Sequence, residues 1–270
     1  MDSEYFDWVE DFELRVQLAK TSTPTEWRMS PIAKEKIRIH ENFRHGTIEE
    51  VTGVCKATQI AGPSPGQEAI VKIKIQLSHW EDETRDLLSP EAYRETNNLS
   101  QLTDEHCSST PAFIARAQFV QGDDGHLPGG YIVFILMERV PGRDLGCFPE
   151  LTLEERDQAR IAFIKALWEF RSHGFLHRDP RRENIIWDRD AQKCYIVDLE
   201  DAEDCKLKRT GIDPRLELSL WNLHGRQSQS AENHLDDDAM IPPEREEGSK
   251  IYDRDELLAL LINRATQRSV

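Results

Sequence analysis

The sequence lacks several features that would place it in a specialised class of protein. Its cysteines are scattered and form no C-x-x-C pair, so neither a disulfide framework nor a zinc site is indicated. No apolar run approaches the length that spans a bilayer. The acidic N-terminus has neither the basic region nor the apolar core of a signal peptide. These absences predict a reducing, intracellular compartment, either cytosol or nucleus.

Positive charge is also scarce. The 270 residues hold 34 Lys and Arg against 50 Asp and Glu, a formal net charge of −16. Such a balance argues against a nucleic-acid partner, which needs a basic footprint, and against attraction to an anionic membrane. Hydrophobic content of 38% and charged content of 31% are ordinary for a globular protein. The length suits one two-lobed domain or two small domains.

Hydrophobic periodicity predicts the elements of the N-terminal half. Phe6, Val9, Phe12 and Val16 fall at helical spacing, so residues 1–33 are expected to be a helical extension and a linker. Ser89-Pro90-Glu91 is a helix start signal. Alternating or continuous apolar runs predict strands at 37–40, 51–60, 69–75, 111–120 and 131–137.

The C-terminal half carries its own start and stop signals. Thr152 and Glu155 form a capping box for a long helix that ends near Gly174. Two apolar pieces, 185–187 and 195–197, predict a small hairpin. Further helices are expected from Asp213-Pro214 and from Asp253-x-x-Glu256, with a polar loop before the last one.

One segment carries a chemical pattern, His177-Arg178-Asp179 through Asn184. Phosphoryl transfer from ATP needs a carboxylate near the incoming hydroxyl, oxygen ligands for Mg²⁺ and a cation on the phosphates. Asp179 would orient or deprotonate the acceptor, and the Asn184 amide oxygen would face a metal ion. Asp198 follows the hairpin and would be the second metal ligand, because Mg²⁺ prefers hard oxygen donors. His177 is expected to hold the loop by hydrogen bonds.

This segment, with Asn184-Ile185-Ile186 and Ile196-Val197-Asp198-Leu199-Glu200, resembles the catalytic loop and metal-binding segment of the protein kinase-like superfamily. The resemblance implies an α+β, bilobal fold. Its N-lobe, residues 34–137, would have five strands and one long helix. The hinge and a reduced, mainly helical C-lobe would occupy 138–270. The short C-terminal part also resembles uncharacterised fungal kinase-like proteins and relatives of the aminoglycoside phosphotransferases.

The resemblance also implies a lysine that grips the α- and β-phosphates. Lys72 is the best match, and Lys74 on the same strand face competes with it. The ion-pair partner on the first long helix would be Glu95, with Glu91 as the fallback.

Further residues of the nucleotide site are implied around the hinge. Met137 would stand behind the adenine, and the backbone of Glu138 and Val140 would pair with it. Asp144 could reach the ribose. Arg181 stands where many protein kinases place a lysine near the γ-phosphate.

Three departures from the family pattern affect the function. Residues 44–53 hold only Gly46 and Gly53 instead of G-x-G-x-x-G, Glu200 replaces a glycine, and no Ala-Pro-Glu follows Asp198. The incomplete glycine loop and Glu200 favour a pseudokinase, whereas the retained Lys72, Asp179, Asn184 and Asp198 favour catalysis. The expected function is an ATP- and Mg²⁺-dependent phosphotransferase with an unknown hydroxyl-bearing acceptor. Protein Ser/Thr is favoured, because aminoglycoside and choline phosphotransferases usually carry Gly where Arg178 stands. A small-molecule kinase of that type and a pseudokinase acting as an interaction module remain alternatives.

Overall fold

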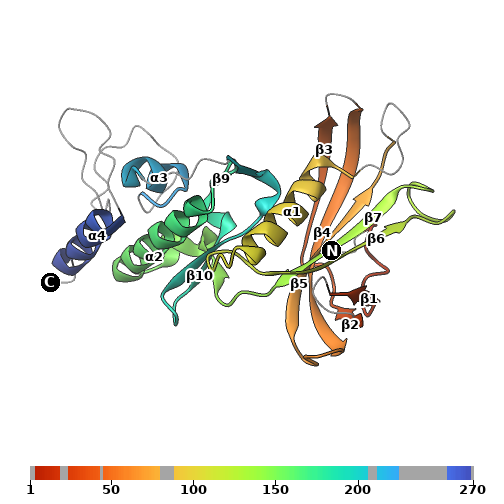
Figure 1. The fold of residues 1–270 in the computed structure, drawn as a ribbon, viewed down its shortest axis with the longest axis horizontal. Helices are drawn as coiled ribbons and strands as arrows, with labels where there is room; N and C mark the ends of the chain where they lie inside the picture. Colours follow the sequence, from red (N-terminus) through yellow and green to blue (C-terminus); the bar gives the residue numbers. More distant parts are fainter. Residues whose placement is uncertain are drawn as a thin grey trace. The chain divides into compact units, whose positions relative to one another are not determined.

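A computed structural model describes residues 4–18, 24–42, 45–79, 88–205, 212–224 and 254–268. The chain divides into two compact units (Figure 1). The first comprises Met1–Gln101 and Ala112–Arg139, and the second comprises Leu102–Pro111 and Val140–Val270. The boundaries expected from the sequence lay at 33/34 and 137/138.

The first unit is an antiparallel sheet with one helix. Along the sheet the strand order is β1-β2-β4-β5-β7-β6, and β3 pairs with β4 outside that path. The elements are β1 (Glu13–Gln17), β2 (Pro24–Met29), β3 (Lys34–Asn42), β4 (Gly46–Ala61), β5 (Glu68–Gln76), α1 (Pro90–Asp104), β6 (Phe113–Val120) and β7 (Tyr131–Glu138).

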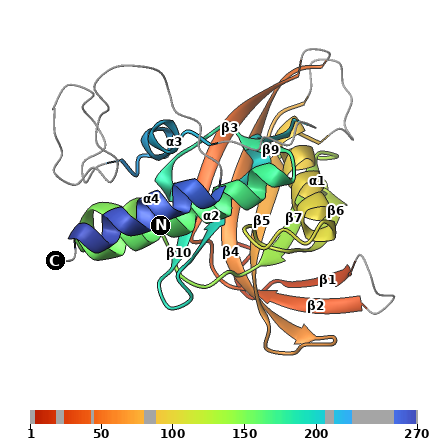
Figure 2. The same ribbon diagram turned by 60° about the vertical axis from the view of Figure 1, so that its left-hand side comes forward.

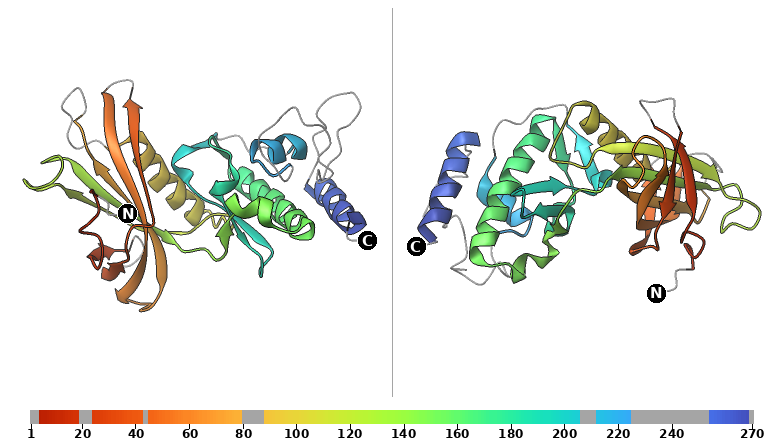
Figure 3. Two further views of the ribbon diagram at one scale, coloured as in Figure 1. Left: turned by 180° about the vertical axis from the view of Figure 1, so that it is seen from behind. Right: turned by 90° about the horizontal axis from the view of Figure 1, so that it is seen from below.

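The predicted bilobal protein kinase-like fold is wrong. The protein is mostly β, with 36% strand and 31% helix, and six strands of the first unit form a nearly closed antiparallel barrel-like sheet. The prediction of a five-stranded N-lobe missed β1 and β2. These strands add to one side of β4, which pairs with β3 along its first half and with β2 near its end. This long strand is orange in Figure 3.

The predicted N-terminal helix is also wrong. Residues Glu13–Gln17 alternate between exposed and buried, with Leu14 and Val16 inside, and Thr25, Trp27 and Met29 of β2 alternate in the same way. Phe6 lies in a turn and Val9 follows that turn, and both contribute their side chains to the same core. Apolar residues three or four apart fit one face of a helix. Leu14 and Val16, two residues apart, also fit one face of a strand, and pairing with β2 selects the strand.

Strand β5 separates two faces of different chemistry. Val71, Ile73 and Ile75 point into the apolar core of the sheet. Lys72 and Lys74 alternate with them and therefore point to the opposite face. The predicted strand is confirmed, and so is α1, whose amide at Ala92 is capped by the Ser89 hydroxyl. The predicted strands that became β3, β4, β6 and β7 are confirmed as well.

The second unit combines helices with two small sheets. Its strand orders are β11-β10-β8 and β12-β9. The elements are β8 (Arg143–Asp144), η1 (Leu145–Glu150), α2 (Leu153–Ser172), β9 (Phe175–His177), η2 (Arg182–Asn184), β10 (Ile185–Asp188), β11 (Lys193–Ile196), η3 (Leu199–Asp201), β12 (Ala202–Asp204), α3 (Pro214–Leu220) and α4 (Arg254–Arg268).

Helix α2 is the centre of this unit. It packs along β11 and α4, which lies beside it in Figure 2. The Thr152 half of the predicted capping box is confirmed, because the Thr152 hydroxyl accepts a bond from the Glu155 amide at 3.2 Å. The Glu155 side chain lies near Arg143 instead, with 3.8 Å between Glu155 Oε1 and a guanidinium nitrogen. Arg171 joins α2 to α3 through Glu217 at 2.6 Å. The predicted hairpin and the last two helices are confirmed. The expected Asp253 cap and polar loop fall outside the described residues.

Within the part of the chain that is described, no helix combines the length and the apolar character needed to cross a membrane.

The close packing of Phe6 on Gly53 provides a test of this fold. A Cβ added at Gly53 would lie 2.8 Å from Phe6 Cζ and 3.0 Å from Ile32 Cδ1. We therefore expect Gly53→Ala to lower the free energy of unfolding by about 1–3 kcal/mol, because the core cannot absorb an extra methyl group. Urea denaturation would measure this change.

The matched control is Gly122→Ala, in an exposed loop, which should change stability little. In the Phe6→Ala background the cost of Gly53→Ala should shrink, because the ring that it would strike is gone. Strictly additive costs would contradict the described contact.

Candidate functional site

His177 clamps the loop that carries the chemical pattern. Its Nε2 lies 3.1 Å from the Val197 carbonyl oxygen, and its Nδ1 accepts a bond from the Asp179 amide at 3.2 Å. The two bonds require a neutral ring with its proton on Nε2. Burial lowers the pKa of His177, which favours that neutral form. The predicted structural role of His177 is confirmed.

Asp179 and Asn184 lie together at the two ends of this loop. The Asn184 side-chain nitrogen donates to the Asp179 backbone oxygen at 3.0 Å and approaches the Asp179 carboxylate at 3.4 Å. Because these contacts occupy the amide nitrogen, the amide oxygen is the atom left to meet a metal ion. Arg181 forms an ion pair with the same carboxylate. Half-exposed Asp179 is thus held in place but still open to a substrate.

The backbone just before Asp198 is tied to Asn184 after the hairpin. The Val197 amide donates to the Asn184 carbonyl oxygen at 3.0 Å, so Asp198 follows directly after a residue bonded to Asn184. Asp198 has the left-handed backbone conformation, with φ 63° and ψ 57°. A residue other than glycine adopts it at a cost of about 1–2 kcal/mol, and such strain is concentrated at functional sites.

The oxygen donors of this cluster suit a hard cation. Asp179, Asn184 and Asp198 offer two carboxylates and an amide oxygen, and contain no sulfur or imidazole donor. Mg²⁺ takes few protein ligands and keeps several waters, so this set fits it. All three residues belong to the second unit.

In the first unit, the predicted ion pair between Lys72 and Glu95 is present. The Lys72 Nζ lies 2.5 Å from Glu95 Oε1, joining β5 to α1. The fallback partner, Glu91, contacts His40 at 2.7 Å and Arg94 at 2.5 Å instead. Glu95 is 1% exposed and Lys72 is 9% exposed. A buried carboxylate therefore holds a lysine whose side chain still reaches the surface.

Lys74 belongs to a different cluster, which the sequence did not reveal. Its side chain is 0% exposed, and its Nζ lies 3.0 Å from Glu50 Oε1. The Tyr131 hydroxyl donates to Glu50 Oε2 at 2.7 Å, and the Ser89 hydroxyl donates to it at 2.8 Å. His40 lies 3.1 Å from Glu50. Because Lys74 is fully enclosed by these groups, Lys72 is the better candidate for contact with a ligand.

The charges of this buried cluster depend on each other. Burial opposes the charged form of His40, but pairing with Glu50 and Glu91 outweighs it and raises the pKa of His40 to about 9. Burial alone would raise the pKa of Glu50, whereas the charges of Lys74 and His40 lower it to about 2. The cluster therefore carries a permanently ionised Glu50 that holds Ser89 at the start of α1.

The residues predicted to surround adenine lie near the end of β7 and after it. Met137 is buried, and Glu138 accepts a bond from the Ala112 amide at 3.1 Å. Asp144 caps the short helix η1 by accepting from the Gly146 amide at 3.1 Å. Val140 is half-buried. Asp144 thus has a structural partner that the sequence did not suggest.

The glycines of the expected phosphate loop have structural roles. Gly46 has a φ of 80° and pairs with Asn42 where the hairpin of β3 and β4 closes. Gly53 lies within β4, where Phe6 covers it. Arg44, the start of that expected loop, is outside the described residues. Glu200, in place of the family's glycine, is buried in η3.

The comparisons with known proteins add no family. No model of a known protein family matches the chain, and no curated protein matches it.

The buried cluster predicts how stability depends on pH. The folded-state pKa of His40, about 9, exceeds its ordinary value of 6.5. Its stabilising contribution is therefore fully present below pH 6.5 and is lost as the pH rises through about 9. We expect wild type to lose on the order of 2–3 kcal/mol of stability relative to His40→Gln over this range.

Urea denaturation of both proteins at several pH values between 6 and 9.5 would measure the difference. The variant should begin less stable and converge on wild type at the alkaline end. Parallel pH profiles for the two proteins would show that His40 is not charged in the folded state.

Proposed function

We propose that this protein is an ATP- and Mg²⁺-dependent phosphotransferase that transfers the γ-phosphate to a hydroxyl group, with protein Ser/Thr as the favoured acceptor. The proposal rests on the hydrogen bonds of the loop that carries Asp179 and Asn184. His177 fixes this loop through Val197 and Asp179, and the Asn184 side chain bonds to Asp179. The Val197 amide bonds to the Asn184 carbonyl oxygen and so ties the residue before Asp198 to the same loop.

In the proposed reaction the acceptor oxygen attacks the γ-phosphorus of ATP. The bond from that phosphorus to the β–γ bridging oxygen breaks, and ADP leaves. The acceptor proton passes to the Asp179 carboxylate, which is a general base of the kind used in such transfers. Arg181, already paired with Asp179, would place its positive charge near the transferred group. Bound Mg²⁺ would neutralise charge that develops on the phosphates.

The first unit supports the same chemistry through Lys72. An ammonium group held by a buried carboxylate presents a fixed positive charge, which suits an α- or β-phosphate. Glu95 lies on α1, whose first turn is fixed by Ser89 and Glu91 through the Glu50 cluster. The Lys72–Glu95 pair is therefore anchored from two sides, by the strand and by the helix.

Arg178 favours a protein acceptor over a small molecule. Its guanidinium is paired with Glu203, with Nε and Nη2 at 2.7 and 2.6 Å from the same carboxylate oxygen. Phosphotransferases of the aminoglycoside and choline type usually have glycine at this position. The paired Arg178 side chain, directly before Asp179 in the sequence, occupies space that a glycine would leave to a small-molecule substrate. This difference favours a protein hydroxyl as the acceptor.

Nucleotide binding is the first testable consequence. We expect Mg-ATP to raise the melting temperature, with a stabilisation of about 2.7 kcal/mol at a concentration 100 times the Kd. Asp198→Asn should abolish the shift because it removes a metal-binding carboxylate, and Lys72→Met should strongly reduce it. Thermal melting with and without EDTA would measure both effects.

Matched controls are available for both variants. Asp190→Asn changes an exposed aspartate of the hairpin turn, and Lys56→Met changes an exposed lysine on the neighbouring strand. Both should retain the wild-type shift. If wild type shows no shift at millimolar Mg-ATP, the proposed phosphotransferase function is wrong.

Phosphate transfer is the second consequence. With γ-labelled ATP, we expect label in serine or threonine of protein acceptors, and Asp179→Asn should lower the rate about 10²–10⁴-fold while keeping the Mg-ATP melting shift. Incubation with fractionated protein and metabolite extracts would measure the label in each fraction. Label only in the metabolite fraction would overturn the protein acceptor, and absence of transfer in both fractions would overturn catalysis.

A further inference from the structure

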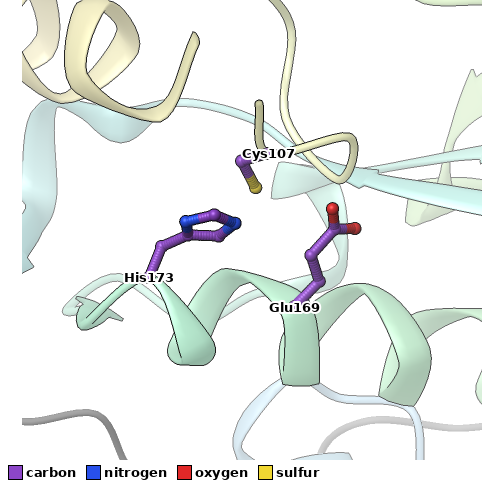
Figure 4. Close-up of side chains that lie close together, drawn as sticks. All are labelled: Cys107, Glu169 and His173. Atoms are coloured by element: carbon purple, nitrogen blue, oxygen red, sulfur yellow. The ribbon is translucent and has the colours of Figure 1, made fainter. Parts of the chain in front are cut away.

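A second cluster of reactive side chains lies away from Asp179, where the segment after α1 meets the end of α2. Cys107, Glu169 and His173 each direct one metal-binding atom to a common point, and these atoms lie within 4.8 Å of one another. Figure 4 shows the thiol, the carboxylate and the imidazole facing inward. All three residues belong to the second unit.

Local structure explains why these residues meet. Glu169 and His173 are four residues apart at the C-terminal end of α2, so they lie on the same face of the helix. Cys107 is placed opposite them by the turn after α1, where its amide donates to the Leu102 carbonyl oxygen at 2.8 Å. The Ser108 amide and hydroxyl then bond to Glu169 at 2.7 and 2.9 Å, which ties that turn to α2.

The orientation of His173 is typical of a metal ligand. Its Nδ1 lies 2.9 Å from Glu105 Oε2, so this nitrogen is engaged outside the cluster. The other ring nitrogen points toward Cys107 and Glu169 (Figure 4). A carboxylate that bonds to one nitrogen of a histidine while the other nitrogen binds metal is the usual arrangement around protein-bound metals.

Glu169 is held in place by hydrogen bonds. The Ser108 amide and hydroxyl donate to its two carboxylate oxygens at 2.7 and 2.9 Å, and the Ser109 hydroxyl also donates to it. Cys107 is buried. A metal ion that binds Cys107 would displace the thiol proton to solvent as the metal–sulfur bond forms.

We propose that Cys107, Glu169 and His173 form a binding site for a divalent transition metal of the Zn²⁺ class. One sulfur, one nitrogen and one oxygen ligand are a set that zinc accepts, and the two anionic ligands balance its charge. A water molecule would supply the fourth ligand, and Glu169 also lines a surface cavity of about 430 Å³ from which water could reach it. Ser109, Ser172 and Lys193 line the same cavity.

The site is independent of the phosphotransferase proposal. It shares no residue with the oxygen cluster of Asp179, Asn184 and Asp198, and its donors are softer than those that suit Mg²⁺. Its formation would join the turn after α1 to α2 more tightly than the hydrogen bonds of Ser108 alone.

Cobalt substitution tests the proposal with the intact 270-residue chain. After metal is removed with a chelator, we expect wild type to bind about one equivalent of Co²⁺ with tetrahedral visible absorption and a thiolate-to-metal band. Cys107→Ser should lose the thiolate band, and His173→Gln should lose tight binding. Zn²⁺ should compete the Co²⁺ away. Absorption spectra and metal analysis of the dialysed protein would measure these effects.

Two further variants separate metal binding from a structural role. Glu105→Gln, outside the ligand set, should weaken Co²⁺ affinity about 10–100-fold without removing the thiolate band. Cys147→Ser, which changes a half-buried cysteine elsewhere in the same unit, should bind like wild type. A wild-type protein without cobalt absorption, or a thiolate band that persists in Cys107→Ser, would overturn the site. Circular dichroism would establish that each variant is folded.

Discussion

Two buried ammonium groups on one face of β5 are the constraint on which the first unit depends. Lys72 and Lys74 point away from the apolar core, and each needs a carboxylate because an unpaired buried charge costs several kcal/mol. Glu95 comes from α1 and Glu50 from β4. The helix and the sheet must therefore meet in one register. His40, Tyr131 and Ser89 complete the shell around Glu50.

This arrangement gives the two lysines different uses. Lys74 is enclosed and forms an ion pair with Glu50. Glu50 in turn accepts a hydrogen bond from Ser89 at the start of α1. Lys72 pairs with Glu95 and keeps a small exposed fraction of 9%, whereas Lys74 has none. Removal of Glu50 would thus affect Lys72 indirectly, through the position of Glu95 one helical turn after Glu91. A structural cluster and a candidate ligand-binding pair are coupled by a single helix.

Sequence reasoning succeeded where the relevant contacts are local. The loop from His177 to Asn184, the Thr152 cap and the hairpin of β10 and β11 each depend on residues close together in the chain. It failed for the fold of the first unit, because Val16 fits both a helical and a strand period until its partner β2 is known. The resemblance to kinases led to Lys72 and Glu95, yet it did not lead to the barrel-like sheet.

The sequence by itself determined the chemical content of the candidate sites: a carboxylate, an amide and a second carboxylate at short spacing, and a lysine on a strand. Only the tertiary structure showed that Lys74 is fully enclosed with Glu50 and that Lys72 pairs with Glu95, because burial depends on which elements cover a strand face. The same holds for Cys107, whose partners on α2 are distant in sequence and show no metal-binding spacing. Long-range packing brings these residues together. Their spacing in the sequence does not indicate which distant segments will pack against each other.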